Sequence, residues 1–341
     1  MKYLFGNMSF SLNCDDITNT ALKKRIEDKL KFNFNAFEAS DKDKHDVEFY
    51  FCDNFKDSDL IKYKDQDIEF GFCFQDCFKV YFICNNSDRG LFDIKFFSSA
   101  YVNHFEGLLI KFYHRVFLFF VLIVQSNNKF SLIHGASISY HDNGFLFVGP
   151  SGAGKTKMLL NILELNGASF VADDFSILDN NRLYCNGSYM VIKKYHQSWM
   201  SANKTKTDMP FLQRLQWKLF NKDLKFRVSP KKVFNSISTS VDLKGVFLLA
   251  KGDDFKVSKI NVDQIIDFIL KDFFSEFSSC MNVYKEVGHN DFMPSLSQVV
   301  NNIELLYRNN FKNINSYKME LPKQYNSNQL ISFLNKSKCL V

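Results

Sequence analysis

The sequence lacks the features that mark several protein classes. Its eight cysteines lie far apart, and only Cys73 and Cys77 are close, without the second ligand pair that a zinc site requires. The net charge of +6 is mild and spread along the chain, whereas a dedicated nucleic-acid-binding protein more often concentrates Lys and Arg in one stripe. The sequence therefore predicts neither a zinc site nor a nucleic-acid partner.

Long apolar runs are missing as well. The apolar segment VFLFFVLIV at residues 116–124 has nine residues, whereas a membrane-spanning helix needs about 20. The first residues, MKYLFGNMSFSLNCDD, contain no apolar stretch typical of a signal peptide. We therefore expect a cytoplasmic protein with reduced thiols and no membrane span, in which residues 116–124 belong to a buried core helix.

Two domains fit into the 341 residues. Residues 1–95 contain short segments rich in aromatic and β-branched residues, separated by polar turns, and this pattern predicts a β-rich module. Residues 96–341 mix strand and helix patterns and predict an α/β (α+β mixed) domain. The expected strands of this domain are residues 130–140, 144–149, 169–179 and 243–252, and its expected helices are residues 155–165, 262–277, 296–309 and 326–336.

A glycine-rich loop follows the expected strand at residues 144–149. Residues 149–156, GPSGAGKT, match the phosphate-loop pattern G-x-x-x-x-G-K-[ST] in full. Its glycines allow consecutive N–H groups to turn inward, and the following helix adds its positive end. An apolar strand before it and a helix after it argue against a loop that binds nothing. The predicted nucleotide-binding residues are Gly149, Pro150, Ser151, Gly152, Ala153, Gly154, Lys155, Thr156 and Lys157.

Two aspartates and a histidine on neighbouring expected strands provide further candidates. Asp173 and Asp174 come at the end of the apolar run SFVA, and His134 lies in LIHGAS. Adjacent side chains on a strand point to opposite faces, so both carboxylates reach one site only where the strand ends or bends. One would hold Mg²⁺ and the other would take a proton from an attacking hydroxyl. A turn or cap role for the aspartates, and a core role for His134, are the alternatives.

Taken together, residues 132–174 resemble the core of the HPr kinase/phosphorylase family and of the wider group of HPr-kinase-like serine kinases. That group shares its nucleotide-binding core with ATP-dependent phosphoenolpyruvate carboxykinase. Three features carry the resemblance in order: His134-Gly135 on one strand, the loop GPSGAGKT, and A-D-D ending at Asp174 on the next strand.

The resemblance implies a role for each matching residue. Lys155 would contact the outer phosphates of ATP (or GTP), and Thr156 and Asp174 would hold Mg²⁺. Asp173 would be the general base, and His134 would lie near the metal and the transferring phosphate. Residues 180–252 lack the glycine-rich signature with an arginine that serves phosphorolysis in HPr kinases. The resemblance therefore implies neither HPr as the substrate nor a phosphorylase activity.

The leading hypothesis is an ATP-dependent, Mg²⁺-requiring kinase that phosphorylates a hydroxyl, with a Ser of a peptide or small protein as the expected acceptor. Residues 1–95 would recruit that acceptor or serve in assembly, for example of a homo-oligomer. Two alternatives stay open at this point. One is a regulatory module that binds ATP without transferring phosphate, and the other is a small-molecule kinase with the same core.

Overall fold

The computed structural model describes part of the chain. The described residues are 2–5, 8–14, 20–21, 23–24, 27, 47–52, 70–74, 78–84, 92–98, 130–186, 190–192, 226–278, 281, 295–337 and 340. The helix expected around residues 116–124 lies outside them. Two compact units make up the protein: Met1–Lys129 with Phe274–Leu305, and Phe130–Phe273 with Leu306–Val341. The boundary expected between residues 95 and 96 falls within the first unit.

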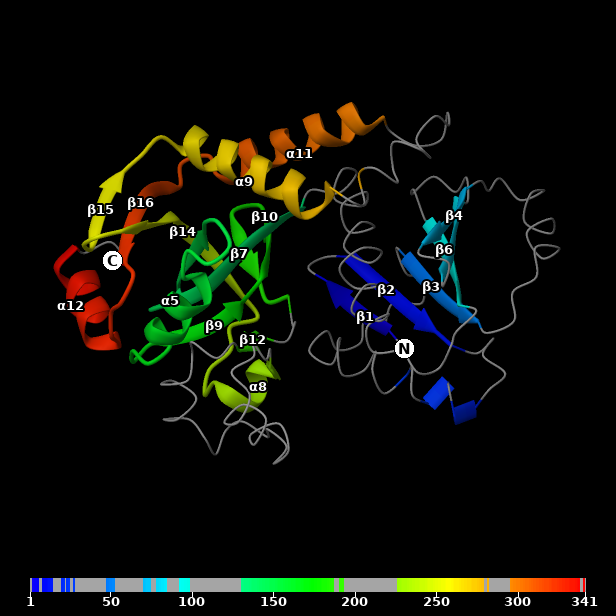
Figure 1. Ribbon diagram of the computed structural model, residues 1–341, viewed down its shortest axis with the longest axis horizontal. Helices are drawn as coiled ribbons and strands as arrows, with labels where there is room; N and C mark the ends of the chain where they lie inside the picture. Colours follow the sequence, from blue (N-terminus) through cyan, green and yellow to red (C-terminus); the bar gives the residue numbers. More distant parts are fainter. Residues whose placement is uncertain are drawn as a thin grey trace. The chain divides into compact units, whose positions relative to one another are not determined.

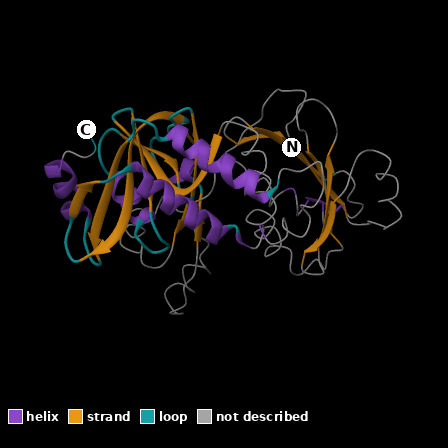
Figure 2. Ribbon diagram, turned by 90° about the horizontal axis from the view of Figure 1, so that it is seen from above, coloured by secondary structure: helices purple, strands orange, loops and turns teal. Residues whose placement is uncertain are grey.

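The first unit contains a six-stranded sheet with the order β1-β2-β3-β6-β5-β4. Its strands are β1 (Lys2–Phe5), β2 (Met8–Asn13), β3 (Val47–Cys52), β4 (Phe70–Phe74), β5 (Phe78–Cys84) and β6 (Phe92–Ser98). β4 and β5 pair antiparallel with Phe74 opposite Phe78, as expected of a hairpin. β3 instead runs parallel to both β2 and β6. Strands therefore dominate the described part of this unit (Figure 2).

An eight-stranded mixed sheet forms the centre of the second unit (Figure 1). Its strands are β7 (Phe130–Tyr140), β8 (Asn143–Val148), β9 (Ala168–Ala172), β10 (Phe175–Asp179), β11 (Arg182–Tyr184), β14 (Ser240–Gly252), β15 (Lys256–Lys259) and β16 (Asn315–Pro322). The order is β11-β10-β7-β8-β14-β16-β15, and β9 also pairs with β7. The predicted mixed α/β fold is confirmed.

Helices and a small second sheet complete the description. The helices are α5 (Lys155–Ile162), α8 (Pro230–Val233), α9 (Val262–Glu276), α11 (Leu296–Asn310) and α12 (Ser327–Ser337), and β12 (Met190–Ile192) pairs with β13 (Phe226–Val228). The helices expected from spacing at residues 262–277, 296–309 and 326–336 are confirmed to within one residue at each end. Among the helices that the structure describes, none has both the length and the apolar character required to cross a membrane.

Three parallel strands end at the same edge of the large sheet. β14 runs parallel to β8, with Leu248 opposite Val148, and also parallel to β16, with Gly252 opposite Pro322. The glycine-rich loop begins directly after β8. In sheets of this kind, ligands bind outside the carboxyl ends of parallel strands. The topology therefore places the ends of β14 and β16 beside the loop.

The single strand predicted at residues 169–179 is wrong. The structure has two strands, β9 and β10, separated by Asp173 and Asp174. Asp174 adopts a left-handed conformation with φ 71°, and the Phe175 N–H donates to the Asp173 carbonyl at 2.9 Å. Because a left-handed residue cannot continue a strand, the chain turns at this point. Both strands still pair antiparallel with β7.

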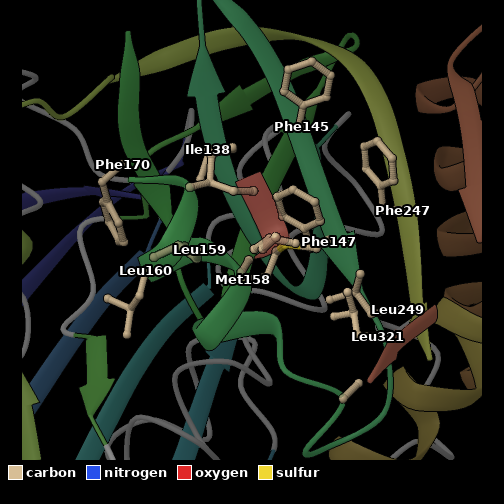
Figure 3. Close-up of a cluster of buried hydrophobic side chains, with 14 of the residues drawn as sticks. Ile138, Phe145, Phe147, Met158, Leu159, Leu160, Phe170, Phe247, Leu249 and Leu321 are labelled. Carbon is tan, nitrogen blue, oxygen red and sulfur yellow. The ribbon is translucent and has the colours of Figure 1, made fainter. Parts of the chain in front are cut away.

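A hydrophobic core fixes β8 and α5 on either side of the loop (Figure 3). Phe147 on β8 stacks on Phe247 of β14 with ring centroids 5.4 Å apart, and both side chains are fully buried. From α5, Met158 and Leu159 are fully buried in the same cluster. Because the buried side chains of β8 and α5 are closely packed, the loop between these two elements is held in place at both ends.

Candidate phosphate-binding and transfer site

The site is organised around Gly135, on β7. On one side Gly135 pairs with Val148, the last residue of β8 before the glycine-rich loop. On the other side its N–H donates to the carbonyl of Asp174 at 3.0 Å. A Cβ on Gly135 would lie 2.9 Å from the Phe147 carbonyl oxygen, so only glycine allows this close approach. The start of the loop and the aspartate turn therefore flank a single residue of β7.

The glycine-rich loop has the backbone geometry of an anion site. Gly152 and Gly154 take left-handed conformations with φ 77° and 102°. Gly154 is the N-cap of α5, and no side chain caps that end of the helix. The first N–H groups of a helix have no partner within the helix, and they carry its positive end. Backbone donors are consequently directed to the position at which the motif predicts phosphates.

Lys155 and Thr156 connect the loop to the aspartate turn. The Lys155 ammonium donates to the carbonyl of Gly149 at 2.6 Å. The Thr156 hydroxyl donates to the Asp173 carboxylate, with Oδ1 at 3.1 Å and Oδ2 at 3.2 Å. Thr156 and Asp173 were both predicted site residues, and the structure brings them into direct contact.

Asp173 has an unusual environment for a carboxyl group. Its side chain is only 4% exposed. Burial, and secondarily the negative charge of Asp174, raise the pKa of Asp173 to about 7. Hydrogen bonds from Thr156 and from the Asp174 backbone, together with the charge of Lys155, lower this pKa but do not offset the burial. A carboxyl group that titrates near neutrality suits proton transfer, because it can both take and release a proton.

His134 and Asp174 form the other half of the site. His134 Nε2 lies 3.7 Å from Asp174 Oδ1, and the two side chains are 12% and 44% exposed. The imidazole lies beside the ring of Phe175, with centroids 5.5 Å apart. The antiparallel register explains this position, because His134 pairs with Phe175, the residue after Asp174. Four of the five residues predicted for catalysis and metal binding, His134, Thr156, Asp173 and Asp174, thus lie on adjoining segments, and the fifth, Lys155, precedes Thr156.

A residue that sequence reasoning did not select completes this half. Asp272 on α9 places Oδ2 2.7 Å from Nδ1 of His134, across 138 residues of sequence. Ile265 and Ile269 are buried on α9, and Asp272 follows them by seven and three residues, so it lies on their face of the helix. A carboxylate on the apolar face was the only signal for this residue in the sequence.

Lys157 is the predicted nucleotide-binding residue that the structure directs elsewhere. Its ammonium donates to the Tyr325 carbonyl at 3.0 Å and lies over the Tyr325 ring at 3.5 Å from the centroid. Burial lowers the pKa of Lys157. The side chain therefore joins α5 to the segment after β16, and its predicted contact with a nucleotide stays a prediction.

Two further side chains lie against the loop from the ends of β14 and β16. The Lys251 ammonium lies 3.9 Å from the position of a Cβ on Gly152, and the Tyr325 hydroxyl lies 3.7 Å from that of a Cβ on Gly154. Lys251 is exposed, while the Tyr325 hydroxyl is buried without a hydrogen-bond partner among the described residues. The parallel alignment of β8, β14 and β16 brings them here, which a local sequence pattern does not reveal.

Comparisons with known proteins add little to this geometry. No protein-family model and no curated protein matches the sequence. Among solved structures, the chain matches the Hpr(Ser) kinase/phosphatase from Coxiella burnetii with a TM-score of 0.29 and 12% sequence identity. That match covers 61% of this chain and 96% of the Coxiella protein. Similarity at this level does not establish a shared fold.

Proposed function

We propose that the protein is a kinase that transfers the γ-phosphoryl group of ATP (or GTP) to a hydroxyl group. The observation that carries this proposal is the contact between Thr156 and Asp173. It joins the first turn of the phosphate-loop helix to a buried carboxyl group with a pKa of about 7. Holding a nucleotide does not require a buried carboxyl group that takes up a proton near neutral pH, whereas phosphoryl transfer to a hydroxyl does.

The proposed reaction assigns each proton and bond to a group. The acceptor oxygen attacks the γ-phosphorus, and the bond from phosphorus to the β–γ bridging oxygen breaks. Asp173 accepts the proton that the acceptor hydroxyl loses. The Lys155 ammonium and the N–H groups of the loop stabilise the negative charge on the phosphate oxygens.

The donors around the aspartate turn suit Mg²⁺. Thr156 supplies a hydroxyl and Asp174 supplies a carboxylate. Hard oxygen donors of this kind are the ligands that Mg²⁺ prefers. The mutual repulsion of the two carboxylates contributes to the raised pKa of Asp173, and a bound cation would relieve it. As predicted from the sequence, Thr156 and Asp174 would hold the metal, which would neutralise charge on the nucleotide phosphates.

The proposed acceptor is a Ser hydroxyl on a peptide or small protein. The test incubates the full chain with γ-labelled ATP, Mg²⁺ and lysate from its own host, with Asp173→Asn as the control. Label on a protein or peptide band with the wild-type chain alone supports the proposal. Label on a small molecule would indicate a different acceptor. ATP binding without label or turnover would support the regulatory module instead.

Lys251 gives a separate prediction for nucleotide binding. Lys251→Met is expected to weaken ATP binding by up to about fivefold, because an exposed ion pair contributes up to about 1 kcal/mol. Fluorescent-nucleotide titration at constant salt measures this change. Lys244→Met is the matched control, since Lys244 is exposed on the same strand seven residues earlier. Equal affinities in the two variants would show that Lys251 does not contact the phosphates.

A further inference from the structure

We infer that Asn186 is a positioning residue that holds the turn at Asp173 and Asp174 in the conformation that phosphoryl transfer requires. The inference rests on the proposed function, because it gives Asn186 the task of placing the carboxyl group of Asp173. Asn186 lies just beyond β11 and is completely buried, with 0% of its surface exposed.

The side-chain amide of Asn186 connects the two sides of this turn. Its Nδ2 donates to the carbonyl of Phe175, and also to the carbonyl of Asp173 at 3.4 Å. Because carbonyl oxygens only accept hydrogen bonds, the amide nitrogen must be the atom that faces them. One buried side chain thus links the residue before Asp174 to the residue after it.

Strand pairing explains why Asn186 reaches the turn. β10 and β11 pair antiparallel with Ile177 opposite Tyr184, which is the last residue of β11. Continuing this register by two residues brings Asn186 level with Phe175, where its amide contacts the Phe175 carbonyl. The same pair of strands therefore carries the turn and the amide that closes it.

The turn requires such a contact because its backbone conformation is unfavourable on its own. Asp174 is left-handed, at φ 71°, and residues other than glycine keep this conformation only where the surrounding structure fixes it. The turn directs Asp173 to Thr156 and Asp174 to His134. In an extended strand the two carboxylates would point to opposite faces. Opening of the turn would therefore move the proposed base relative to the phosphate loop.

Asn186→Leu tests this role, because leucine has a similar volume but no hydrogen-bond donor in its side chain. We expect kcat to fall about 10- to 100-fold, since a small displacement of a reacting group can cost about 10²-fold in rate. Affinity for ATP should change little, because the glycine-rich loop and Lys155 are the proposed phosphate contacts. Rapid-quench measurement of transfer and fluorescent-nucleotide titration of the full chain measure the two quantities separately.

Asn310→Leu is the matched control for the loss of a buried amide. Asn310 is 4% exposed, and its amide donates at 3.0 Å to Ser131, which pairs with Leu178 near the other end of β10. Urea unfolding should show lower stability in both variants, whereas only Asn186→Leu should lose transfer. An equal loss of kcat in Asn310→Leu would show that destabilisation alone explains the effect, and the positioning role would be overturned.

A double variant shows whether Asn186 acts through Asp173. In Asp173→Asn the proposed base is already absent, so adding Asn186→Leu should lower transfer by a smaller factor than in the wild-type chain. Asp267→Asn, at an exposed position on α9, is the matched background, in which the full loss should remain. A full further loss in the Asp173→Asn background would contradict the inference.

Hydrogen exchange provides a readout that does not depend on activity. The Phe175 N–H donates to the Asp173 carbonyl at 2.9 Å within the turn, so opening of the turn should accelerate its exchange. Mass spectrometry of peptides that contain the turn measures this rate in the full chain. We expect faster exchange in Asn186→Leu and the wild-type rate in Asn310→Leu. The wild-type rate in both variants would show that Asn186 does not hold the turn.

Asn186→Ser serves as the test if Asn186→Leu does not fold. Serine leaves room for a water beside the two carbonyls, and such a water is held less firmly than a side-chain amide. We expect kcat to fall several-fold with ATP affinity unchanged. Wild-type kcat in this variant would overturn the positioning role.

The outcomes separate the two proposals. If the wild-type chain transfers no phosphate but exchange at the turn accelerates only in Asn186→Leu, the kinase proposal fails and Asn186 still holds the turn. If the wild-type chain transfers phosphate and Asn186→Leu keeps its kcat, the positioning role fails and the kinase proposal stands.

Discussion

Replacing Asp173 with Asn is expected to reduce phosphoryl transfer about 10²- to 10⁴-fold, the range for loss of a general base. The amide cannot accept the proton of the acceptor hydroxyl, but it can still accept the hydrogen bond from Thr156. ATP binding should therefore persist. Single-turnover transfer and nucleotide titration on the same protein measure the two quantities. Asp267→Asn is the matched control, and equal transfer rates in the two variants would contradict the proposed base.

The same substitution, Asp173→Asn, is expected to increase the stability of the folded protein although it reduces phosphoryl transfer. Burial, and then the charge of Asp174, raise the pKa of Asp173 to about 7 in the folded protein, above its usual 3.8. Between these values the folded state binds more protons than the unfolded state, so the stability that this group contributes falls as pH rises from about 4 to about 7. Asp173→Asn should therefore be more stable than wild type above pH 7, with the difference vanishing near pH 4. Urea unfolding across this range measures it.

The pH dependence of the reaction follows from the same group. For a base in the free enzyme, kcat/KM falls as the base becomes protonated. Because the pKa of Asp173 is about 7, kcat/KM should decline tenfold for each pH unit well below 7. An acid limb centred near pH 4 would show that another carboxyl group, or none, takes the proton.

Replacing Lys155 with Met has the second large expected effect, a loss of about 10²- to 10³-fold in transfer. The substitution removes a cation from the phosphates and also the hydrogen bond to the Gly149 carbonyl. ATP affinity should fall as well, because the ammonium would contact phosphates in the ground state and in the transition state. Rapid-quench measurement of transfer at saturating ATP separates the loss in rate from the loss in binding.

Lys157→Met is the control for this substitution, since it removes an ammonium from the same turn of α5. The Lys157 ammonium contacts Tyr325, so its removal should leave transfer nearly unchanged. A loss as large as that of Lys155→Met would instead support the sequence prediction that Lys157 binds the nucleotide. If neither variant loses transfer, the phosphate loop does not act in the proposed way.

Local patterns in the sequence were sufficient to predict the glycine-rich loop, the strand before it and the helix after it. The motif in residues 149–156 depends on glycines at fixed spacing, and the elements around it, β8 and α5, have short apolar patterns of their own. The amphipathic helices α9 and α11 were predicted for the same reason, because apolar residues recur at helical spacing within one segment.

Features that depend on distant pairing were not predictable in this way. The turn at Asp174 interrupts an apolar stretch that reads as a single strand, because nothing local signals a left-handed aspartate. β16 was missed, since its place beside β14 is set by parallel pairing over about 70 residues. Asp272 and Lys251 reach the site through helix packing and strand order, and neither belongs to a motif.

The left-handed conformation of Asp174 restricts which residues can replace it during evolution. At φ 71°, glycine, asparagine and aspartate are tolerated, whereas other residues add backbone strain of about 1–2 kcal/mol. A lineage that lost the chemistry of this carboxylate would therefore be expected to retain Asn or Gly at the position rather than Ala or Ser. Sequencing of related genes would then distinguish active from decayed copies by this one codon.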